Sequence, residues 1–108
     1  MLYFLVTSDI SPILRFVTLP VISNVDCAKS YGSVIISSNI CTSGVNAKSS
    51  CQGDSGGPKT VLINNKRVQI GIVSFGAEKG CTYGYPAVFT RVGSYLTWIG
   101  INSNIIVS

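Results

Sequence analysis

A serine stands among glycines in the stretch Cys51-Gln52-Gly53-Asp54-Ser55-Gly56-Gly57-Pro58. Glycines this dense let the backbone approach a bound group closely and turn several N–H donors toward one point. Acyl transfer needs this combination, because a hydroxyl attacks a carbonyl whose oxygen becomes negative and must be stabilised. The other interpretation is a tight, disulfide-anchored turn in which Ser55 only caps the backbone. The surrounding elements decide between the two.

The segments that follow the serine motif predict a β-hairpin. Residues 60–63 (Thr-Val-Leu-Ile) predict a strand, Asn64-Asn65-Lys66 has turn composition, and residues 67–75 predict a long second strand. A serine in the Gly-x-Ser-x-Gly elbow of an α/β-hydrolase lies between a strand and a helix. Here Pro58 comes directly after the glycines and a strand comes next, so the elbow is excluded.

The remaining segments predict a mostly β chain. Ser23 is the expected N-cap of a short helix that ends at Tyr31-Gly32. Tyr95, Trp98 and Ile99 lie at i, i+3 and i+4, which indicates a C-terminal helix. Four further strands are expected, at residues 14–19, 34–36, 39–42 and 86–92. Short strands at this spacing with a terminal helix favour an antiparallel barrel or sandwich.

Composition limits the class of protein. The chain has 108 residues, 46% of them hydrophobic and 11% charged, which is typical of one small globular domain. The net charge of +4 comes from scattered residues, and only Lys66-Arg67 are adjacent. A basic run with interleaved aromatic residues is absent, so we expect no nucleic-acid partner. No histidine occurs in the chain, and we expect no metal and no cofactor.

Cysteine usage indicates an oxidising compartment. The cysteines are Cys27, Cys41, Cys51 and Cys81. Four cysteines allow three disulfide connectivities, and the sequence alone does not choose among them. Two bridges in a small core suit an extracellular protein, whereas buried free thiols in a cytosolic protein are the alternative. Met1 to Val6 is apolar but too short for a signal peptide or a membrane span, so we expect no membrane partner and no export signal within this chain.

At this point the motifs resemble one family closely. From about Ser8 to Ile99 the chain is similar to the C-terminal β-barrel half of a chymotrypsin-like serine protease (family S1), with digestive enzymes of insects as the nearest type. The matching stretches are residues 14–17, 19–23, 49–58, 69–76, 80–81, 84–92 and 95–99. The resemblance implies an all-β fold, with one antiparallel β-barrel of six strands (or five, if incomplete), a short intermediate helix and a C-terminal helix. Residues 8–108 would form this barrel, and residues 1–7 replace its usual first strand.

The resemblance also assigns roles. Ser55 corresponds to the nucleophile, and the N–H groups of Gly53 and Ser55 correspond to the oxyanion hole. Asp54 corresponds to the aspartate that pairs with a new N-terminal ammonium after zymogen cleavage and so orders that hole. The residues expected to bind substrate are Ser49 (the pocket floor), Gln52, Ser74, Phe75, Gly76 and Ala87. The implied disulfides are Cys27–Cys41 and Cys51–Cys81.

Two departures from the family bear on activity. The family's histidine base and its orienting aspartate have no match in this chain, and both belong to an N-terminal barrel that this chain lacks. Because a serine hydroxyl is a weak nucleophile without a base, we expect the chain alone to be inactive. Lys59 occupies a position where the family has an apolar core residue, and we expect its ammonium to turn outward to water.

Two functions are therefore retained. The first is a serine endopeptidase, acting on polypeptide substrates and represented here by a partial chain. An N-terminal barrel carrying the histidine and the aspartate would be its partner. The second is a non-catalytic, protease-like module that binds a peptide or another protein. The intact Gly53-Asp54-Ser55 favours the first, and the missing base favours the second.

Overall fold

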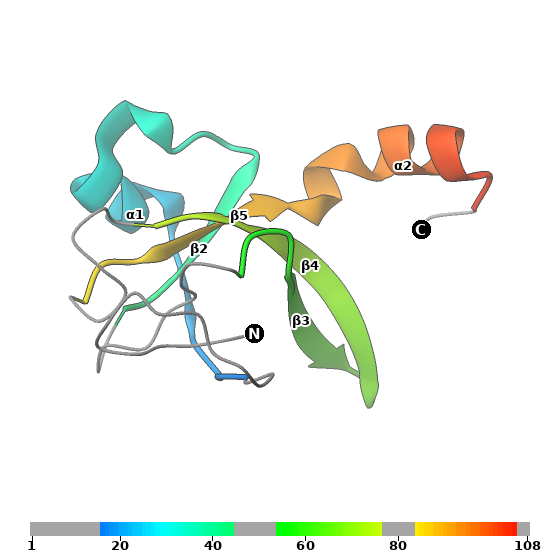
Figure 1. The fold of residues 1–108 in the computed structure, drawn as a ribbon, viewed down its shortest axis with the longest axis horizontal. Coiled ribbons are helices and arrows are strands. Elements are labelled where there is room, and N and C mark those ends of the chain that lie inside the picture. Colours follow the sequence, from blue (N-terminus) through cyan, green and yellow to red (C-terminus); the bar gives the residue numbers. More distant parts are fainter. Residues whose placement is uncertain (1–15, 45–53, 77–83, 106–108) are drawn as a thin grey trace.

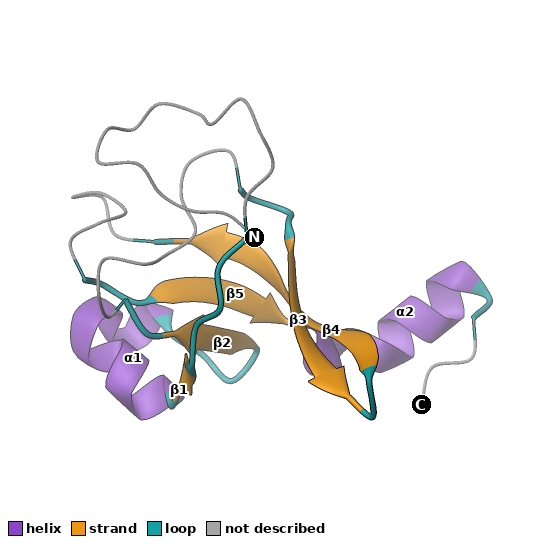
Figure 2. Cartoon of the chain, turned by 90° about the horizontal axis from the view of Figure 1, so that it is seen from below, coloured by secondary structure: helices purple, strands orange, loops and turns teal. Residues whose placement is uncertain are grey.

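Five antiparallel strands form one open sheet (Figure 1). The structure is a computed structural model, and it describes residues 16–44, 54–76 and 84–105. The strands are β1 (Val21–Ile22), β2 (Asn39–Thr42), β3 (Pro58–Ile63), β4 (Lys66–Phe75) and β5 (Ala87–Arg91). Their order across the sheet is β1-β2-β5-β4-β3. The described residues thus contain five strands of the expected antiparallel fold, and these five do not close into a barrel, since β1 and β3 lie at opposite edges (Figure 2).

Helical segments flank the strands. They are α1 (Asn24–Tyr31), the 3₁₀ turns η1 (Gly32–Val34) and η3 (Val92–Tyr95), and α2 (Leu96–Ser103). The predicted start of α1 is confirmed, because Ser23 accepts a hydrogen bond from the N–H of Asp26 at 3.1 Å. Gly32 ends the helix with a φ of 66°, which a residue with a Cβ adopts only at a cost. No helix in the described part is long and apolar enough to cross a membrane.

The predicted hairpin is confirmed. Asn64 and Asn65 have φ values of 50° and 65°, and Ile63 pairs with Lys66 across the turn. Two consecutive residues with positive φ match the twist of the flanking strands, which is why asparagine is favoured there.

Two predicted strands are wrong. Residues 34–36 lie in η1 and the loop after it, and residues 16–19, the described part of the strand expected at 14–19, join no ladder. Asparagine side chains explain the first case. Asn24 Nδ2 donates to the carbonyls of Ile36 and Asn39, and Asn39 accepts from the N–H of Ile36. These bonds satisfy backbone groups that a strand would otherwise pair.

The core lies on both faces of β5. On one face Ala87 and Phe89 pack with Ile40 and Val73. On the other, Val88 packs with the disulfide-bonded pair Cys27 and Cys41 beneath α1. Burial on both faces explains the uninterrupted apolar run of β5, in place of the alternation of a half-exposed strand.

Helix α2 extends away from the sheet (Figure 1). None of its residues is buried, and Trp98 and Ile101 are 64% and 73% exposed. Of the residues expected to share one apolar face, Tyr95 lies in η3 and is exposed, Trp98 is exposed, and Ile99 is partly buried.

Candidate functional site

Ser55 lies at an exposed turn that is hydrogen-bonded onto β4. The N–H of Gly57 donates to the carbonyl of Asp54 at 2.8 Å and closes the turn. The N–H of Gly56 donates to the carbonyl of Val73 at 3.0 Å, and the N–H of Val73 donates to the carbonyl of Gly57 at 2.9 Å. Backbone bonds to a buried strand residue thus hold the turn, and the hydroxyl of Ser55 faces solvent.

Glycine is required at each of the two positions after the serine, for a different structural reason at each. Gly56 has a φ of 87°, a conformation that favours glycine, and a Cβ there would meet no atom within 4 Å. Gly57 has no such torsion, but a Cβ on it would lie 2.9 Å from the carbonyl oxygen of Asp54. One glycine permits the torsion and the next permits the close approach, so the sequence Ser-Gly-Gly is what this turn requires.

The end of β4 lies next to the serine turn. Val73 bonds to the turn, and Ser74, Phe75 and Gly76 follow it directly in the chain. The ladder with β5 shifts between Val73, which pairs with Phe89, and Phe75, which pairs with Val88, so Ser74 is the extra residue of a β-bulge. Bulges bend a strand and re-aim its side chains. Here Ser74 and Gly76 are exposed, and a Cβ on Gly76 would meet nothing within 4 Å.

Ala87 begins β5 and is fully buried. It pairs with Thr42 and packs with Ile40, Val73 and Phe89. Its methyl group is therefore part of the core directly behind the end of β4.

The structure brings together only part of the expected site. Asp54, Ser55, Ser74, Phe75, Gly76 and Ala87 are described and gather around the end of β4. The expected residues Ser49, Gln52, Gly53, Cys51 and Cys81 lie outside the described residues, so their roles and the second disulfide stay predictions. No cluster of possible metal ligands occurs among the described residues.

A disulfide and a tyrosine fix α1 to the sheet behind this site. Cys27 in α1 is bonded to Cys41 in β2, which is the first pairing that the resemblance implies. Tyr31, at the end of α1, donates its hydroxyl to the carbonyl of Pro86 and sets its ring edge-on to Phe75, with centroids 5.6 Å apart. Burial, and secondarily Tyr85, raises the pKa of Tyr31 above its usual value. Tyr31 thus links the segment before β5 to the end of β4.

Lys59 does not behave as expected. The sequence predicts an ammonium that turns to water, but the side chain is partly buried and its Nζ lies 5.8 Å from the centre of the Phe89 ring. Desolvation lowers the pKa of this amine. The prediction of an outward lysine is wrong because the side chain of Lys59 lies over the Phe89 ring, which attracts the cation.

Known proteins match this chain over most of its length. The family model Trypsin matches residues 6–99. The chain belongs to the trypsin family of serine proteases. Brachyurin from Leptuca pugilator is 45% identical over 96 residues, which are 89% of this chain and 40% of that protein. Collagenase from Hypoderma lineatum is 43% identical over 95 residues, which are 87% of this chain and 36% of that protein.

A solved structure shows the same fold. The structure of HL collagenase superposes with a TM-score of 0.72 and 43% sequence identity, covering 81% of this chain and 37% of that one. The described sheet is therefore trypsin-like. The chain spans about two fifths of the length of the curated relatives that it matches.

Sequence reasoning missed one feature, a cavity lined by residues of β3 and of the segment 16–19. A signal for it existed. The sequence alternates over residues 14–19 as a strand does, and residues 16–19 alternate between exposed and half-buried although they join no ladder.

Proposed function

We propose that this chain is the C-terminal part of a trypsin-family endopeptidase in which Ser55 is the nucleophile. The observation that carries the proposal is the placement of Ser55 on an exposed turn whose Gly56 and Gly57 are hydrogen-bonded to Val73, the residue before Ser74. A polypeptide extended along Ser74–Gly76 would pair with the strand end in β fashion. Its scissile carbonyl would then lie near the serine hydroxyl. Family membership and identity above 40% to two serine-protease relatives support this assignment.

The other site residues have roles in the same proposal. Gly53 and Ser55 donate backbone N–H groups to the oxyanion, and Asp54 orders them. Ser49 forms the floor of the pocket for the substrate side chain, with Gln52, Phe75, Gly76 and Ala87 around it. A neutral floor disfavours a cationic side chain, because its charge would lose water without gaining a partner. We therefore propose a chymotrypsin-like preference for large apolar residues. A comparison of kcat/KM across peptides that vary only at the residue before the cut tests this preference, and a higher kcat/KM for lysine or arginine than for phenylalanine would contradict it.

The chain alone has no base for the reaction. It contains no histidine, so no imidazole can take the proton of Ser55, and the proposal places that base in an N-terminal barrel outside this chain. The Cys27–Cys41 disulfide and the family support an extracellular location for the complete enzyme. A protease-like module that binds peptides without cutting them remains the second candidate, and the missing histidine is the observation that favours it.

The transcript upstream of Met1 tests the two candidates. An in-frame segment that encodes a histidine-bearing barrel supports the endopeptidase, and the joined protein should hydrolyse peptides while its Ser55→Ala variant should not. A signal peptide directly before this chain supports the binding module.

Labelling by a fluorophosphonate probe is the matching test on the chain itself. Without a base, Ser55 should react no faster than an ordinary exposed serine, and Ser55→Ala should change the labelling little. Rapid stoichiometric labelling that Ser55→Ala abolishes would contradict inactivity of the chain and would require another base.

A further inference from the structure

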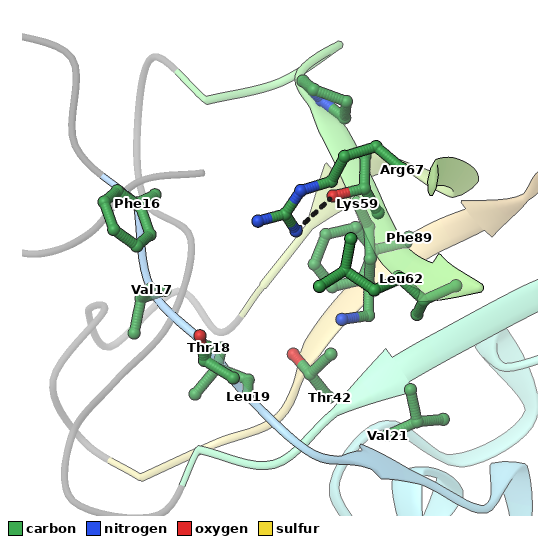
Figure 3. A pocket seen from close by; sticks show the side chains of 13 residues that line it. Phe16, Val17, Thr18, Leu19, Val21, Thr42, Lys59, Leu62, Arg67 and Phe89 are labelled. Carbon is green, nitrogen blue, oxygen red and sulfur yellow. Dashed lines mark hydrogen bonds between the residues drawn. The ribbon is translucent and has the colours of Figure 1, made fainter. Parts of the chain in front are cut away.

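A cavity of about 480 Å³ lies between the segment Phe16–Leu19 and β3 (Figure 3). One wall is the segment Phe16–Leu19, and the other is β3 from Pro58 to Leu62. Thr42 and Phe89 line it between these walls. All its lining residues are described, and Ser55 is not among them. The volume falls within the range of pockets that hold small organic ligands.

Two polar groups in the cavity have no partner in the described structure. Thr42 is fully buried, and its Oγ1 makes no hydrogen bond there. The Nζ of Lys59 lies 5.8 Å from the centre of the Phe89 ring, and no hydrogen bond or ion pair joins it to another described residue. In Figure 3 the Lys59 amine and the Thr42 hydroxyl both point into the space between β3 and the Phe16–Leu19 segment. A buried hydroxyl without a partner costs about 1–3 kcal/mol, so an acceptor placed between these two groups would be stabilised by both.

The charge of the lining favours an anion. The lining residues include Lys59 and Arg67 and no aspartate or glutamate. Arg67 keeps its guanidinium at the cavity by donating Nη1 to Thr60 Oγ1 at 3.4 Å. Of the described acids, Asp26 pairs with Lys29 at 3.1 Å on α1, and Asp54 belongs to the serine turn. The cavity thus holds cations that no lining carboxylate neutralises.

The rest of the lining is apolar. The apolar lining residues include Leu19, Val61, Leu62 and Phe89, and Phe16 also lines the cavity with 85% of its own surface exposed. An apolar ligand body in the cavity would bury such surface, at roughly 25 cal/mol per Å². The lining therefore suits a molecule that has one anionic end and an apolar body.

We propose that this cavity binds a small amphipathic monocarboxylate, such as a medium-chain fatty acid, with its carboxylate between Lys59 Nζ and Thr42 Oγ1. The carboxylate accepts a hydrogen bond from each group, and the alkyl chain lies along Leu19, Val61 and Phe89. The site is separate from the serine turn and does not depend on the proposed protease function.

Titration calorimetry of the oxidised full chain with three ten-carbon probes tests the head group. Decanoate should bind at least tenfold more tightly than decanol or decylamine, because the carboxylate forms charge-assisted hydrogen bonds with both donors and its negative charge complements the positive lining. Equal affinity for decanol, or no decanoate binding up to its solubility, would overturn the proposal.

Matched variants test the two donors. Lys59→Met and Thr42→Val keep the side-chain size, and each should weaken decanoate binding about tenfold or more. Lys66→Met removes the same charge from the exposed hairpin turn and should change the affinity less than twofold, as should Ser55→Ala. Unchanged decanoate binding by Lys59→Met would overturn the proposal.

The thermal midpoint of the free variants separates lost binding from lost folding. Each donor variant removes a polar group without a partner, so its midpoint without ligand should be equal to or above that of the original chain. A midpoint that falls together with the affinity would assign Lys59 and Thr42 to the core and overturn their role in binding.

Discussion

At the scale of single residues, the torsion of Gly56 holds Ser55 on its turn. With a φ of 87° and open space around its Cα, Gly56 is needed for conformation and not for space. Gly56→Ala should cost about 1–2 kcal/mol of unfolding free energy, the usual penalty of the left-handed region for a residue with a Cβ. Gly76→Ala is the control, because it also meets open space but has no positive φ, and it should be close to neutral. Urea unfolding measures the stability of both variants. Equal losses of unfolding free energy would show that the torsion at position 56 imposes no penalty on a side chain.

Lys59 gives a pH dependence whose sign follows from its lowered pKa. Between the folded-state pKa and the unfolded value near 10.5, the unfolded chain binds more protons, so stability rises with pH in that window. Lys59→Met should therefore stabilise the chain at neutral pH, and its advantage should shrink as the pH rises toward 10.5.

Urea unfolding at pH 7, 8.5 and 9.5 checks this prediction. Lys66→Met separates the burial of Lys59 from the change in net charge, because Lys66 lies on the exposed hairpin turn. A stability difference between Lys59→Met and the original chain that stays constant over this range would contradict a desolvated amine. Measurements above pH 10 are avoided, since the raised pKa of Tyr31 lowers stability there as pH increases.

At the scale of elements, Tyr31 connects α1 to two parts of the sheet. Tyr31→Phe removes the hydrogen bond to the carbonyl of Pro86 and keeps the edge-on ring contact with Phe75. It should cost about 1 kcal/mol of unfolding free energy, and more if the buried carbonyl finds no water. Thermal unfolding of both variants checks this prediction. Tyr95→Phe, at the half-exposed Tyr95 of η3, should leave the unfolding free energy nearly unchanged. Equal losses in both variants would show that the Pro86 bond contributes nothing.

Elements with local signals could be predicted from the sequence, and those that depend on distant partners could not. Ser23 and Gly32 bracket α1, and Asn64-Asn65 close the hairpin, because each acts through its own torsions or a neighbour three residues away. The strand expected at residues 34–36 failed because Asn24, twelve residues from Ile36, bonds the backbone there. The direction of the Lys59 side chain depends on the register of β3 against β4. This register shifts at a bulge between Lys59 and Thr60, which no local sequence pattern predicts.

At the scale of the whole molecule, the same division applies to the site. The serine turn could be located from Gly-Asp-Ser-Gly-Gly-Pro alone, because its glycines serve local torsions and close contacts. The cavity could not, because it arises where Phe16–Leu19 and β3, some forty residues apart in the chain, face each other across the sheet. Whether a sheet closes is also a non-local property, and the described strands leave β1 and β3 apart.

The open architecture predicts exposed apolar surface on α2. Trp98 and Ile101 are 64% and 73% exposed, and Ile105 just beyond the helix is 63% exposed. Such a patch on a small protein is typical of an interaction surface. We expect the isolated chain to bind an anilinonaphthalene dye and to associate weakly with itself.

Replacement of Trp98 and Ile101 by serine locates the patch. Because neither side chain is buried, the double variant should change unfolding free energy by only about 0.5 kcal/mol per site, yet it should reduce dye binding several-fold. Val73→Ser in the core should instead destabilise the chain by more than about 2 kcal/mol and increase dye binding. If the helix variant binds as much dye as the original chain, the exposed surface lies elsewhere. A large loss of stability in that variant would show that α2 packs against the domain in solution.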